Sequence, residues 1–287
     1  MSLPLEILFS QNQRRPAVRA SLAANAHTIV SVFVNPAQFA PHEDFSSYPR
    51  TLPGDLAALA TVASESQSLR VIVPQTRDMY PSGISLDTSE QKGAFVSLDG
   101  LTGTMEGRAR PHFFRGVATV VCKLFNLVQP TRAYFGQKDI QQALLLRRMA
   151  SDLLMTLPSA ENVRIIRTSR AEDGLALSSR NAYLTEVERA HAIVLSRALT
   201  AGAGNTRPLA AAQAVIEAAV KRAKVDGVDM RPDYVSLNDP DTFEELTDDA
   251  FEARTGSTPV VISGAVWVGR TRLIDNFILG DASSIVN

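Results

Sequence analysis

Two polar loops, one around Lys138 and the other around Ser178, carry the residues best suited to bind phosphate. Residues 134–142 read YFGQKDIQQ and place Lys138 two positions after a glycine, just before a predicted helix. Residues 173–181 read DGLALSSRN and place two hydroxyls beside a guanidinium. Each segment follows a predicted strand, and the carboxyl ends of strands and the N-termini of helices favour bound anions. Together the loops predict a phosphate-binding surface at the edge of an α/β sheet.

The pairing of the two loops matters more than either loop alone. Ser178, Ser179 and Arg180 could donate several hydrogen bonds to phosphate oxygens, with the guanidinium in a two-pronged contact. An ordinary polar loop would explain these three residues equally well. An isolated lysine such as Lys138 is usually a solvated surface residue. It is the presence of both loops after strands that favours a phosphate site.

Uncharged amides follow another predicted strand, residues 28–34. Asn35 and Gln38 come after its carboxyl end, where open α/β sheets bind ligands. Amides suit a polyhydroxylated or carboxylate substrate, although an Asn-Pro turn explains Asn35 equally well. Gln141 and Gln142 are adjacent on a predicted helix, so at most one of them should face the same site.

Composition and missing motifs exclude several classes of protein. The formal net charge is −1, so neither a nucleic acid nor an anionic membrane is an expected partner. The 4 histidines lack metal-ligand spacing, and we expect no protein-bound metal site. Serine hydrolase, Walker A and dinucleotide-binding glycine motifs are missing from the sequence. The start does not resemble a signal peptide, and no stretch is apolar enough to span a membrane, which predicts a cytoplasmic protein.

The first part of the chain alternates strand-like and helix-like segments. This alternation predicts a Rossmann-like, doubly wound parallel sheet over residues 1–168. The clearest helix is residues 116–128, because its apolar residues recur at helical spacing. The other predicted helices are residues 53–64 and 140–154, the latter capped by Asp139, and the predicted strands are residues 28–34, 70–73, 133–135 and 163–167.

The order of elements changes after about residue 168. Thr185 and Glu188 form a capping-box signature that opens a helix to about residue 199, and a second helix follows at residues 209–224. Strands are then predicted at residues 234–237, 260–268 and 271–274. Helices followed by strands predict a second, smaller α+β domain over residues 169–287. We expect it to act as a lid over the carboxyl edge of the first sheet.

Six segments resemble, in the same order, those of the pantoate–β-alanine ligase family. They are SVFVNPAQF at residues 31–39, YPRT at 48–51, FRGVATVV at 114–121, YFGQKDIQQ at 134–142, GLALSSRN at 174–181 and GRTRLIDN at 269–276. The resemblance runs from about residue 19 to the end of the chain. It implies a nucleotidyltransferase fold related to class I aminoacyl-tRNA synthetases. It also implies a homodimeric enzyme that joins pantoate and β-alanine through a pantoyl-adenylate, converting ATP to AMP and pyrophosphate.

The resemblance also implies roles for residues that match the family's motifs. The catalytic residues, which bind the ATP phosphates, are Lys138, Ser178 and Arg180. The residues that bind pantoate are Gln38, Gln142 and Asn35. The residues that bind the nucleotide are Gly136, Asp139, Ser179 and Asp55, and Asp55 is expected near the ribose and Mg²⁺. These roles agree with the chemistry, because a pantoate carboxylate is already a nucleophile and needs no general base. Adenylation instead needs alignment and positive charge around the α-phosphorus, with Mg²⁺ sharing the charge.

One family motif is replaced. The family has Met-Gly-x-Leu-His-x-Gly-His before its first helix, and the two histidines stabilise the transferred phosphoryl group. This chain has EILFSQNQRR at residues 6–15, with Gln11 and Arg14 at the histidine positions. Gly54 also takes a commonly acidic position, and His112 and Phe113 replace an expected Gly-His.

Three interpretations of these departures stay open. The chain could be a pantothenate-forming ligase whose start reflects an incomplete or mis-started gene model. It could be a weakened or inactive relative that binds substrate or a partner. It could also be a related nucleotidyltransferase that uses a different acid.

Overall fold

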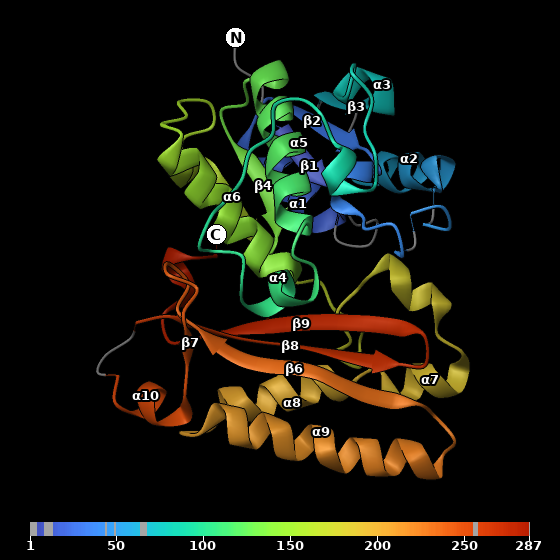
Figure 1. Ribbon diagram of the computed structural model, residues 1–287, viewed down its shortest axis with the longest axis vertical. Coiled ribbons are helices and arrows are strands. Elements are labelled where there is room, and N and C mark those ends of the chain that lie inside the picture. Colours follow the sequence, from blue (N-terminus) through green and yellow to red (C-terminus); the bar gives the residue numbers. More distant parts are fainter. Residues whose placement is uncertain are drawn as a thin grey trace. The chain divides into compact units, whose positions relative to one another are not determined.

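The computed structural model describes residues 5–8, 14–43, 45–48, 50–63, 68–254 and 258–286. The chain divides into two compact units, each with its own sheet (Figure 1). Unit 1 comprises Met1–Gly136 and Gln141–Ile166, and unit 2 comprises Gln137–Ile140 and Arg167–Asn287. The short loop that carries Lys138 therefore groups with the C-terminal part of the chain.

Unit 1 is built on a five-stranded parallel sheet with the order β3-β2-β1-β4-β5. Its strands are β1 (Leu5–Leu8), β2 (His27–Val32), β3 (Ser68–Ile72), β4 (Ala133–Gly136) and β5 (Val163–Ile166). The chain moves outward from β1 to β3 and then crosses to β4 on the other side of β1. Open sheets of this kind bind ligands at the carboxyl ends of the strands, where the direction switches. The parallel α/β fold expected from the sequence is confirmed.

Strand β1 lies at the centre of this sheet, and the sequence analysis did not predict it. Its pairing with β2 and β4 is parallel on both sides. The strand has only 4 residues, and such a short segment takes its conformation from its neighbours more than from its own composition. Gln11 lies outside the described residues, as does the side chain of Arg14, so their predicted positions opposite the nucleotide stay predictions.

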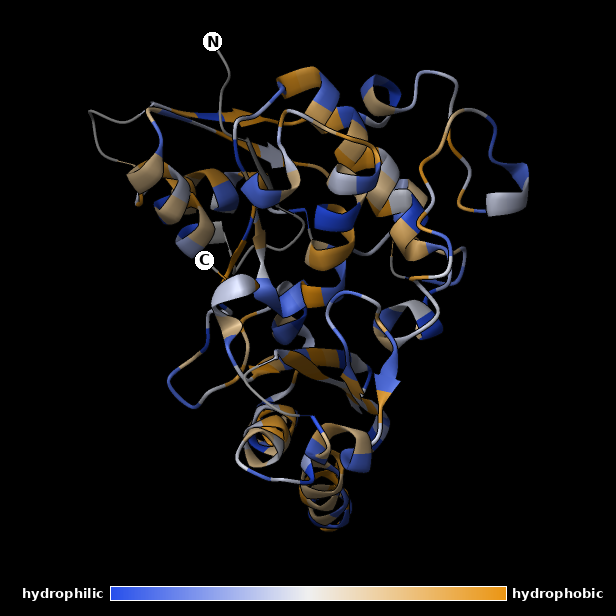
Figure 2. Cartoon of the chain, turned by 90° about the vertical axis from the view of Figure 1, so that its left-hand side faces the viewer, coloured by the Kyte–Doolittle hydropathy of each residue, from blue (hydrophilic) through white to orange (hydrophobic). Residues whose placement is uncertain are grey.

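Helices and short 3₁₀ turns connect the strands of unit 1. The helices are α1 (Arg14–Ala24), α2 (Leu52–Ala60), α3 (Thr76–Met79), α4 (Met105–Ala109), α5 (Phe113–Val128) and α6 (Ile140–Asp152). The 3₁₀ turns are η2 (Pro36–Gln38), η3 (Thr88–Glu90) and η5 (Ala160–Asn162). The predicted face of α5 is buried, with Val120, Leu124 and Phe125 at most 1% exposed. Figure 2 shows this apolar character along the strands and on one side of the helices.

Gly116 lets α5 approach the backbone of η2, which carries Gln38. A Cβ added at Gly116 would collide with the carbonyl of Ala37 and lie 2.6 Å from the amide N of Gln38. We expect Gly116→Ala to destabilise the protein by about 1–3 kcal/mol, because neither backbone group can move without the other. Gly54→Ala is the matched control, since that helical glycine has only ordinary contacts and alanine should stabilise the helix by up to about 1 kcal/mol. Urea unfolding of both variants measures the difference, and equal midpoints would contradict it.

Unit 2 contains a separate antiparallel sheet with the order β7-β6-β8-β9. Its strands are β6 (Met230–Asn238), β7 (Glu245–Leu246), β8 (Val260–Val268) and β9 (Thr271–Leu279). Its helices are α7 (Glu186–His191), α8 (Val194–Ala203), α9 (Pro208–Val225) and α10 (Asp248–Glu252), with 3₁₀ turns η4 (Gln137–Asp139), η6 (Ser179–Tyr183) and η7 (Ala282–Ser284). Leu199, Ile216 and Ile262 join α8, α9 and β8 in one apolar core. This sheet confirms the α+β character expected for the second part.

The helix predicted from residue 186 to about residue 199 is in fact two helices. Its start is as predicted, because Thr185 Oγ1 accepts from the Glu188 amide at 3.3 Å and Glu188 Oε2 accepts from the Thr185 amide at 2.8 Å. At Ala192 the amide is shared between the carbonyls of Glu188 and Arg189, at 3.0 and 3.3 Å. Such tightening toward an i→i+3 pattern ends α7 before α8 begins.

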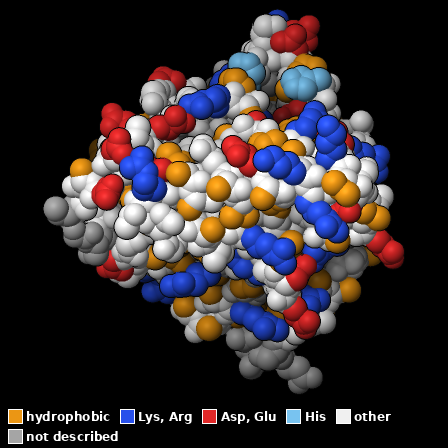
Figure 3. Space-filling model, turned by 90° about the horizontal axis from the view of Figure 1, so that it is seen from below, with side chains coloured by type: hydrophobic (Ala, Val, Ile, Leu, Met, Phe, Trp, Pro, Cys, Tyr) orange, Lys and Arg blue, Asp and Glu red, His pale blue; other side chains and the backbone are white. Residues whose placement is uncertain are grey.

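The surface mixes both signs of charge on the face seen in Figure 3. Lys and Arg side chains alternate there with Asp, Glu and apolar side chains, and no continuous basic area covers that face. Among the described residues, no helix combines the length and the apolar character that crossing a bilayer requires.

Candidate active site

Asn35 is a fully buried amide at the carboxyl end of β2. Its Oδ1 accepts from the Tyr80 hydroxyl at 2.7 Å and from the Ala37 amide at 3.3 Å. Its Nδ2 donates to the Gly116 carbonyl at 3.1 Å and, at a long 3.4 Å, to Gln38 Oε1. These contacts use both amide hydrogens and both lone pairs. Asn35 therefore holds η2, and with it Gln38, in place.

Tyr80 fixes the orientation of the Asn35 amide. Burial raises the pKa of the Tyr80 phenol well above its ordinary value, outweighing the hydrogen bond to Asn35 and the charge of Arg115. The hydroxyl therefore stays protonated and donates to Asn35 Oδ1. Lys123 reinforces this arrangement, since its ammonium lies 4.0 Å from the centre of the Tyr80 ring and donates to the Met79 carbonyl at 2.6 Å.

The two neighbouring glutamines of α6 have different surroundings. Gln141 is engaged with α4, because its Nε2 donates to the Thr104 carbonyl at 3.0 Å and its Oε1 accepts from the Gly107 amide at 3.3 Å. Gln142 is 7% exposed, and its amide is not tied to α4 as that of Gln141 is. Gln142 lies in the first turn of α6, where the helix dipole favours an anion.

Unit 1 also contains Asp55 and Gly136, for which the resemblance predicts a place in the nucleotide site. Asp55 is in the first turn of α2 and is only 6% exposed. Gly136 is the last residue of β4, at the carboxyl edge of the sheet. At the same edge, Arg110 makes a two-pronged ion pair with Glu43, at 2.6 and 2.7 Å, and donates to the Gln38 carbonyl at 3.2 Å. The sequence analysis missed the role of Arg110, which holds Gln38 from its backbone side.

Lys138, in unit 2, is an unusually buried cation. It is 8% exposed, although lysines are almost never buried without a partner. Its Nζ lies 3.3 Å from Oδ1 of Asp139, a carboxylate that is itself partly exposed. A single neighbouring carboxylate at that distance leaves the other ammonium hydrogens available to an anionic ligand.

The second polar loop is held at both ends of its turn. Ser178 caps η6, since its Oγ accepts from the Arg180 amide at 3.3 Å. Asn181 Nδ2 donates to the Ala176 carbonyl at 3.1 Å. Ser179 is 9% exposed, and the Ser178 and Arg180 side chains are half-buried.

Strand β9 contacts both polar loops within unit 2, because η4 and η6 each pack against it. One strand thus supports both Lys138 and the turn that carries Ser178, Ser179 and Arg180. Strand β9 lies in the segment GRTRLIDN and beyond it, and the sequence resemblance implies no role for the individual residues of that segment.

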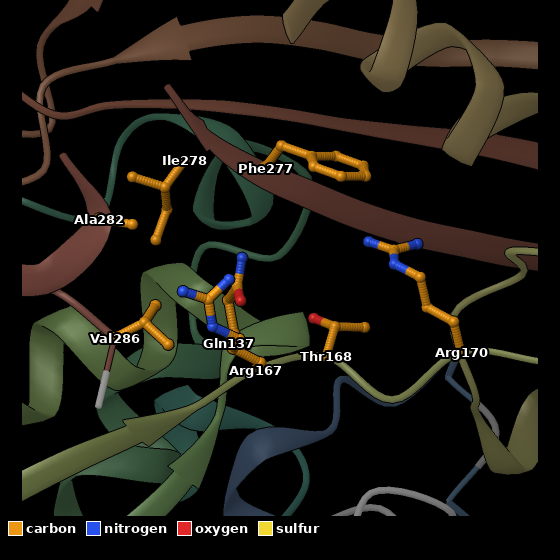
Figure 4. A pocket seen from close by; sticks show the side chains of 8 residues that line it. All are labelled: Gln137, Arg167, Thr168, Arg170, Phe277, Ile278, Ala282 and Val286. Atoms are coloured by element: carbon orange, nitrogen blue, oxygen red, sulfur yellow. The ribbon is translucent and has the colours of Figure 1, made fainter. Parts of the chain in front are cut away.

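Unit 2 contains a pocket of about 180 Å³, which is bordered by Gln137 of η4, by residues 167–170 and by the end of β9 (Figure 4). Its wall is cationic and polar on one side and apolar on the other. The lining residues are Gln137, Arg167, Thr168, Arg170, Phe277, Ile278, Ala282 and Val286. Thr168 Oγ1 is buried and has no hydrogen-bond partner among the described residues. A hydroxyl without a partner and an arginine-bearing wall suit a small anionic ligand.

Comparison with known proteins identifies the family. The family model described as Pantoate-beta-alanine ligase matches residues 15–278. The chain belongs to the pantoate–β-alanine ligase family. Its polar loops around Lys138 and Ser178 both fall inside the matched region, whereas residues 6–14, where the histidine motif is replaced, lie before it.

Individual relatives agree with the family. The chain is 44% identical to the pantothenate synthetase of Herpetosiphon aurantiacus over 267 residues, covering 91% of this chain and 87% of that protein. It is 43% identical to the pantoate–β-alanine ligase of Saccharomyces cerevisiae over 279 residues, with coverages of 91% and 86%. The crystal structure of pantothenate synthetase from Thermus thermophilus superimposes with a TM-score of 0.78 at 36% identity, covering 96% of this chain and 93% of that one.

Proposed function

We propose that this chain condenses pantoate with β-alanine through a pantoyl-adenylate, releasing AMP and pyrophosphate from ATP. Family membership supports the overall reaction. The observation that carries the proposal is the buried cation Lys138, which shares its supporting strand β9 with the turn of Ser178 and Arg180. A buried ammonium and a turn that bears hydroxyl and guanidinium donors, both packed against β9, suit the phosphates of a nucleotide.

The first step joins the pantoate carboxylate to the α-phosphorus of ATP. A carboxylate oxygen forms a bond to phosphorus while the bond to the bridging oxygen of pyrophosphate breaks. Lys138 and Arg180 offset the negative charge that builds up on the phosphates, and Ser178 and Ser179 donate hydrogen bonds to the same oxygens. Gln38 and Gln142 hold pantoate so that its carboxylate points at phosphorus. Asn35 serves the substrate indirectly, by fixing Gln38.

The second step forms the amide. The neutral amine of β-alanine attacks the acyl carbon of the adenylate, and the bond between that carbon and the AMP oxygen breaks. AMP leaves with this oxygen, and the amine loses a proton to give pantothenate. The adenylate is reactive because AMP is a stable leaving group, so this step needs orientation more than acid or base catalysis.

Magnesium would accompany ATP in this reaction. Among the residues described, no group of three or more His, Cys, Asp or Glu side chains could hold a metal ion alone. Mg²⁺ needs no such cluster, since it keeps waters and substrate phosphates and takes only one or two carboxylates. The buried carboxylate of Asp55 fits that requirement. The ion would neutralise phosphate charge. The homodimer and the lid role of residues 169–287 stay predictions.

The replaced histidine motif supports a second candidate, a weakened relative that binds substrates without efficient catalysis. Residues 10–15 read SQNQRR and contain no glycine that would bring the backbone close to a nucleotide. Binding by Lys138, Arg180 and the glutamines does not depend on those residues. Pantoate-dependent exchange of labelled pyrophosphate into ATP separates the candidates, since only an adenylating enzyme supports it.

Exchanging Gln142 for methionine tests the substrate site. We expect Gln142→Met to weaken pantoate binding roughly 10- to 100-fold, as for the loss of one or two hydrogen bonds, and to leave stability unchanged. Gln141→Met is the matched control, because it removes two internal hydrogen bonds and should lower the free energy of unfolding by about 1–3 kcal/mol. Calorimetric titration with pantoate and urea unfolding measure the two effects. Unchanged pantoate affinity in Gln142→Met would remove this residue from the site.

A further inference from the structure

Asn276, on β9, holds the backbone of the Lys138 loop with its side-chain amide. Its Nδ2 donates to the carbonyl of Gln137 at 2.8 Å and to that of Lys138 at 2.9 Å. Its Oδ1 accepts from Gln137 Nε2 at 3.2 Å. Asn276 is only 1% exposed, so water competes little for these bonds. These bonds fix the backbone carbonyls that precede and follow the Cα atom of Lys138. They therefore also fix the position from which the Lys138 side chain extends.

Asp275, the preceding residue, anchors the second loop through Arg170. The carboxylate accepts from Arg170 Nη1 at 2.6 Å and from Nη2 at 2.9 Å, and it is only 4% exposed. Arg170 Nη1 also donates to the Gly174 carbonyl at 3.0 Å. The guanidinium lies over the Phe277 ring, 4.6 Å from its centre (Figure 4). Asp275 and Arg170 form a bidentate pair, the strongest arrangement of this ion pair.

The segment that Arg170 anchors leads directly to the Ser178 turn. The Ala171 amide donates to the Leu175 carbonyl at 2.9 Å, and the Leu177 amide donates to the Ser169 carbonyl at 2.9 Å. Gly174 has φ +93°, a conformation that other residues rarely adopt, and its carbonyl is the one that Arg170 binds. Residues 169–177 thus form a small hairpin. The ion pair of Arg170 with Asp275 therefore fixes the backbone that leads to Ser178 and Ser179.

We propose that Asp275 and Asn276 are positioning residues for phosphate binding, Asn276 for Lys138 and Asp275 for the Ser178 turn. The inference rests on the proposed function, which assigns both loops to the ATP phosphates. Neighbouring residues of a strand project to opposite faces, so one dipeptide can hold two separate loops. Binding groups must be held to within a fraction of an ångström, and a misplacement of about 1 Å can cost about 100-fold in rate.

A double-mutant cycle tests the link between Asn276 and Lys138. Asn276→Asp keeps the shape of the side chain but turns an acceptor toward the two carbonyls. We expect it to weaken binding of ATP, in the presence of Mg²⁺, by about 10-fold or more, and to have little further effect when Lys138 is already alanine. Pantoate affinity should stay unchanged in all variants. An equal loss of ATP affinity on both backgrounds would overturn the inference, because Asn276 would then not act through Lys138.

Amide hydrogen exchange without ligand tests positioning independently of the proposed function. Asn276→Asp should speed exchange at residues 137–140 and spare residues 171–178. Asp275→Asn, which keeps the shape but weakens the ion pair with Arg170, should give the opposite pattern. The same response of both loops to both variants would indicate a general structural role and overturn the proposal. If the unmodified chain binds no ATP, the proposed function fails, while the exchange pattern still decides the positioning roles.

Discussion

Replacing Lys138 with alanine is expected to reduce adenylation by roughly 10²–10³-fold, the usual cost of removing one donor to a transition-state oxyanion. The ammonium is buried, its only described carboxylate partner is the adjacent Asp139, and its loop is fixed by Asn276. Its charge is therefore little screened by water, which strengthens its effect on the phosphates in the proposed site. Pantoate-dependent pyrophosphate exchange measures the rate, and calorimetry measures the accompanying loss of ATP affinity.

The matched control for this variant is Lys221→Ala, which removes a solvent-exposed lysine of α9. It should leave both ATP affinity and exchange unchanged. If the unmodified chain exchanges too slowly, the comparison is made by ATP affinity. Identical ATP binding by the Lys138→Ala and Lys221→Ala variants would exclude Lys138 from the phosphate site.

Restoring the histidine motif is expected to produce the largest gain in activity. The unmodified chain should show slow exchange, near background, because it lacks two imidazole donors and the glycines that bring the backbone close to the nucleotide. Grafting Met-Gly-x-Leu-His-x-Gly-His in place of residues 7–14 should raise the rate by at least about 10²-fold, since each donor is typically worth about 10²–10³. The graft overlaps the last two residues of the central strand β1 (Leu5–Leu8), so the new residues 7 and 8 must keep the pairing with β2.

A second graft in which both histidines are alanine separates the imidazoles from the glycine-rich backbone. It should recover ATP affinity more than rate, because the backbone approach aids binding while the imidazoles act on the transferred phosphoryl group. Robust exchange by the unmodified chain would show that Gln11 and Arg14 form a working variant of the motif. The inactive interpretation would then be abandoned.

Elements with strong periodicity could be predicted from the sequence, and elements defined by their neighbours could not. Strand β8 has the predicted bounds, and α5 begins only one turn earlier than predicted, because both have long apolar patterns. Strand β1 was missed because its conformation depends on pairing with β2 and β4. The division between α7 and α8 was missed because both parts are equally helical in composition.

The same distinction holds for the candidate site. Lys138 and Ser178 could be selected from the sequence because residue type and loop position suggest their chemistry. The contact of Asn276 with the Lys138 carbonyl joins residues 138 positions apart, and no local pattern indicates it. Asn35 matches a pocket position of the family, but its side-chain amide is fully occupied by hydrogen bonds to Tyr80, Ala37, Gly116 and Gln38. Hydrogen-bond saturation of this kind is visible only in three dimensions.

The fate of the pantoate carboxylate oxygens tests the central claim most directly. Pantoate labelled with ¹⁸O in its carboxylate is incubated with ATP, Mg²⁺, β-alanine and enough protein for a single turnover, so that a slow reaction is still detected. Attack on the α-phosphorus followed by amide formation must transfer one ¹⁸O atom to AMP and keep the other in pantothenate. We predict AMP that carries one ¹⁸O atom, from the chain itself or from its histidine graft. Label in inorganic phosphate together with ADP, or no labelled AMP from either protein, would contradict the pantoyl-adenylate mechanism.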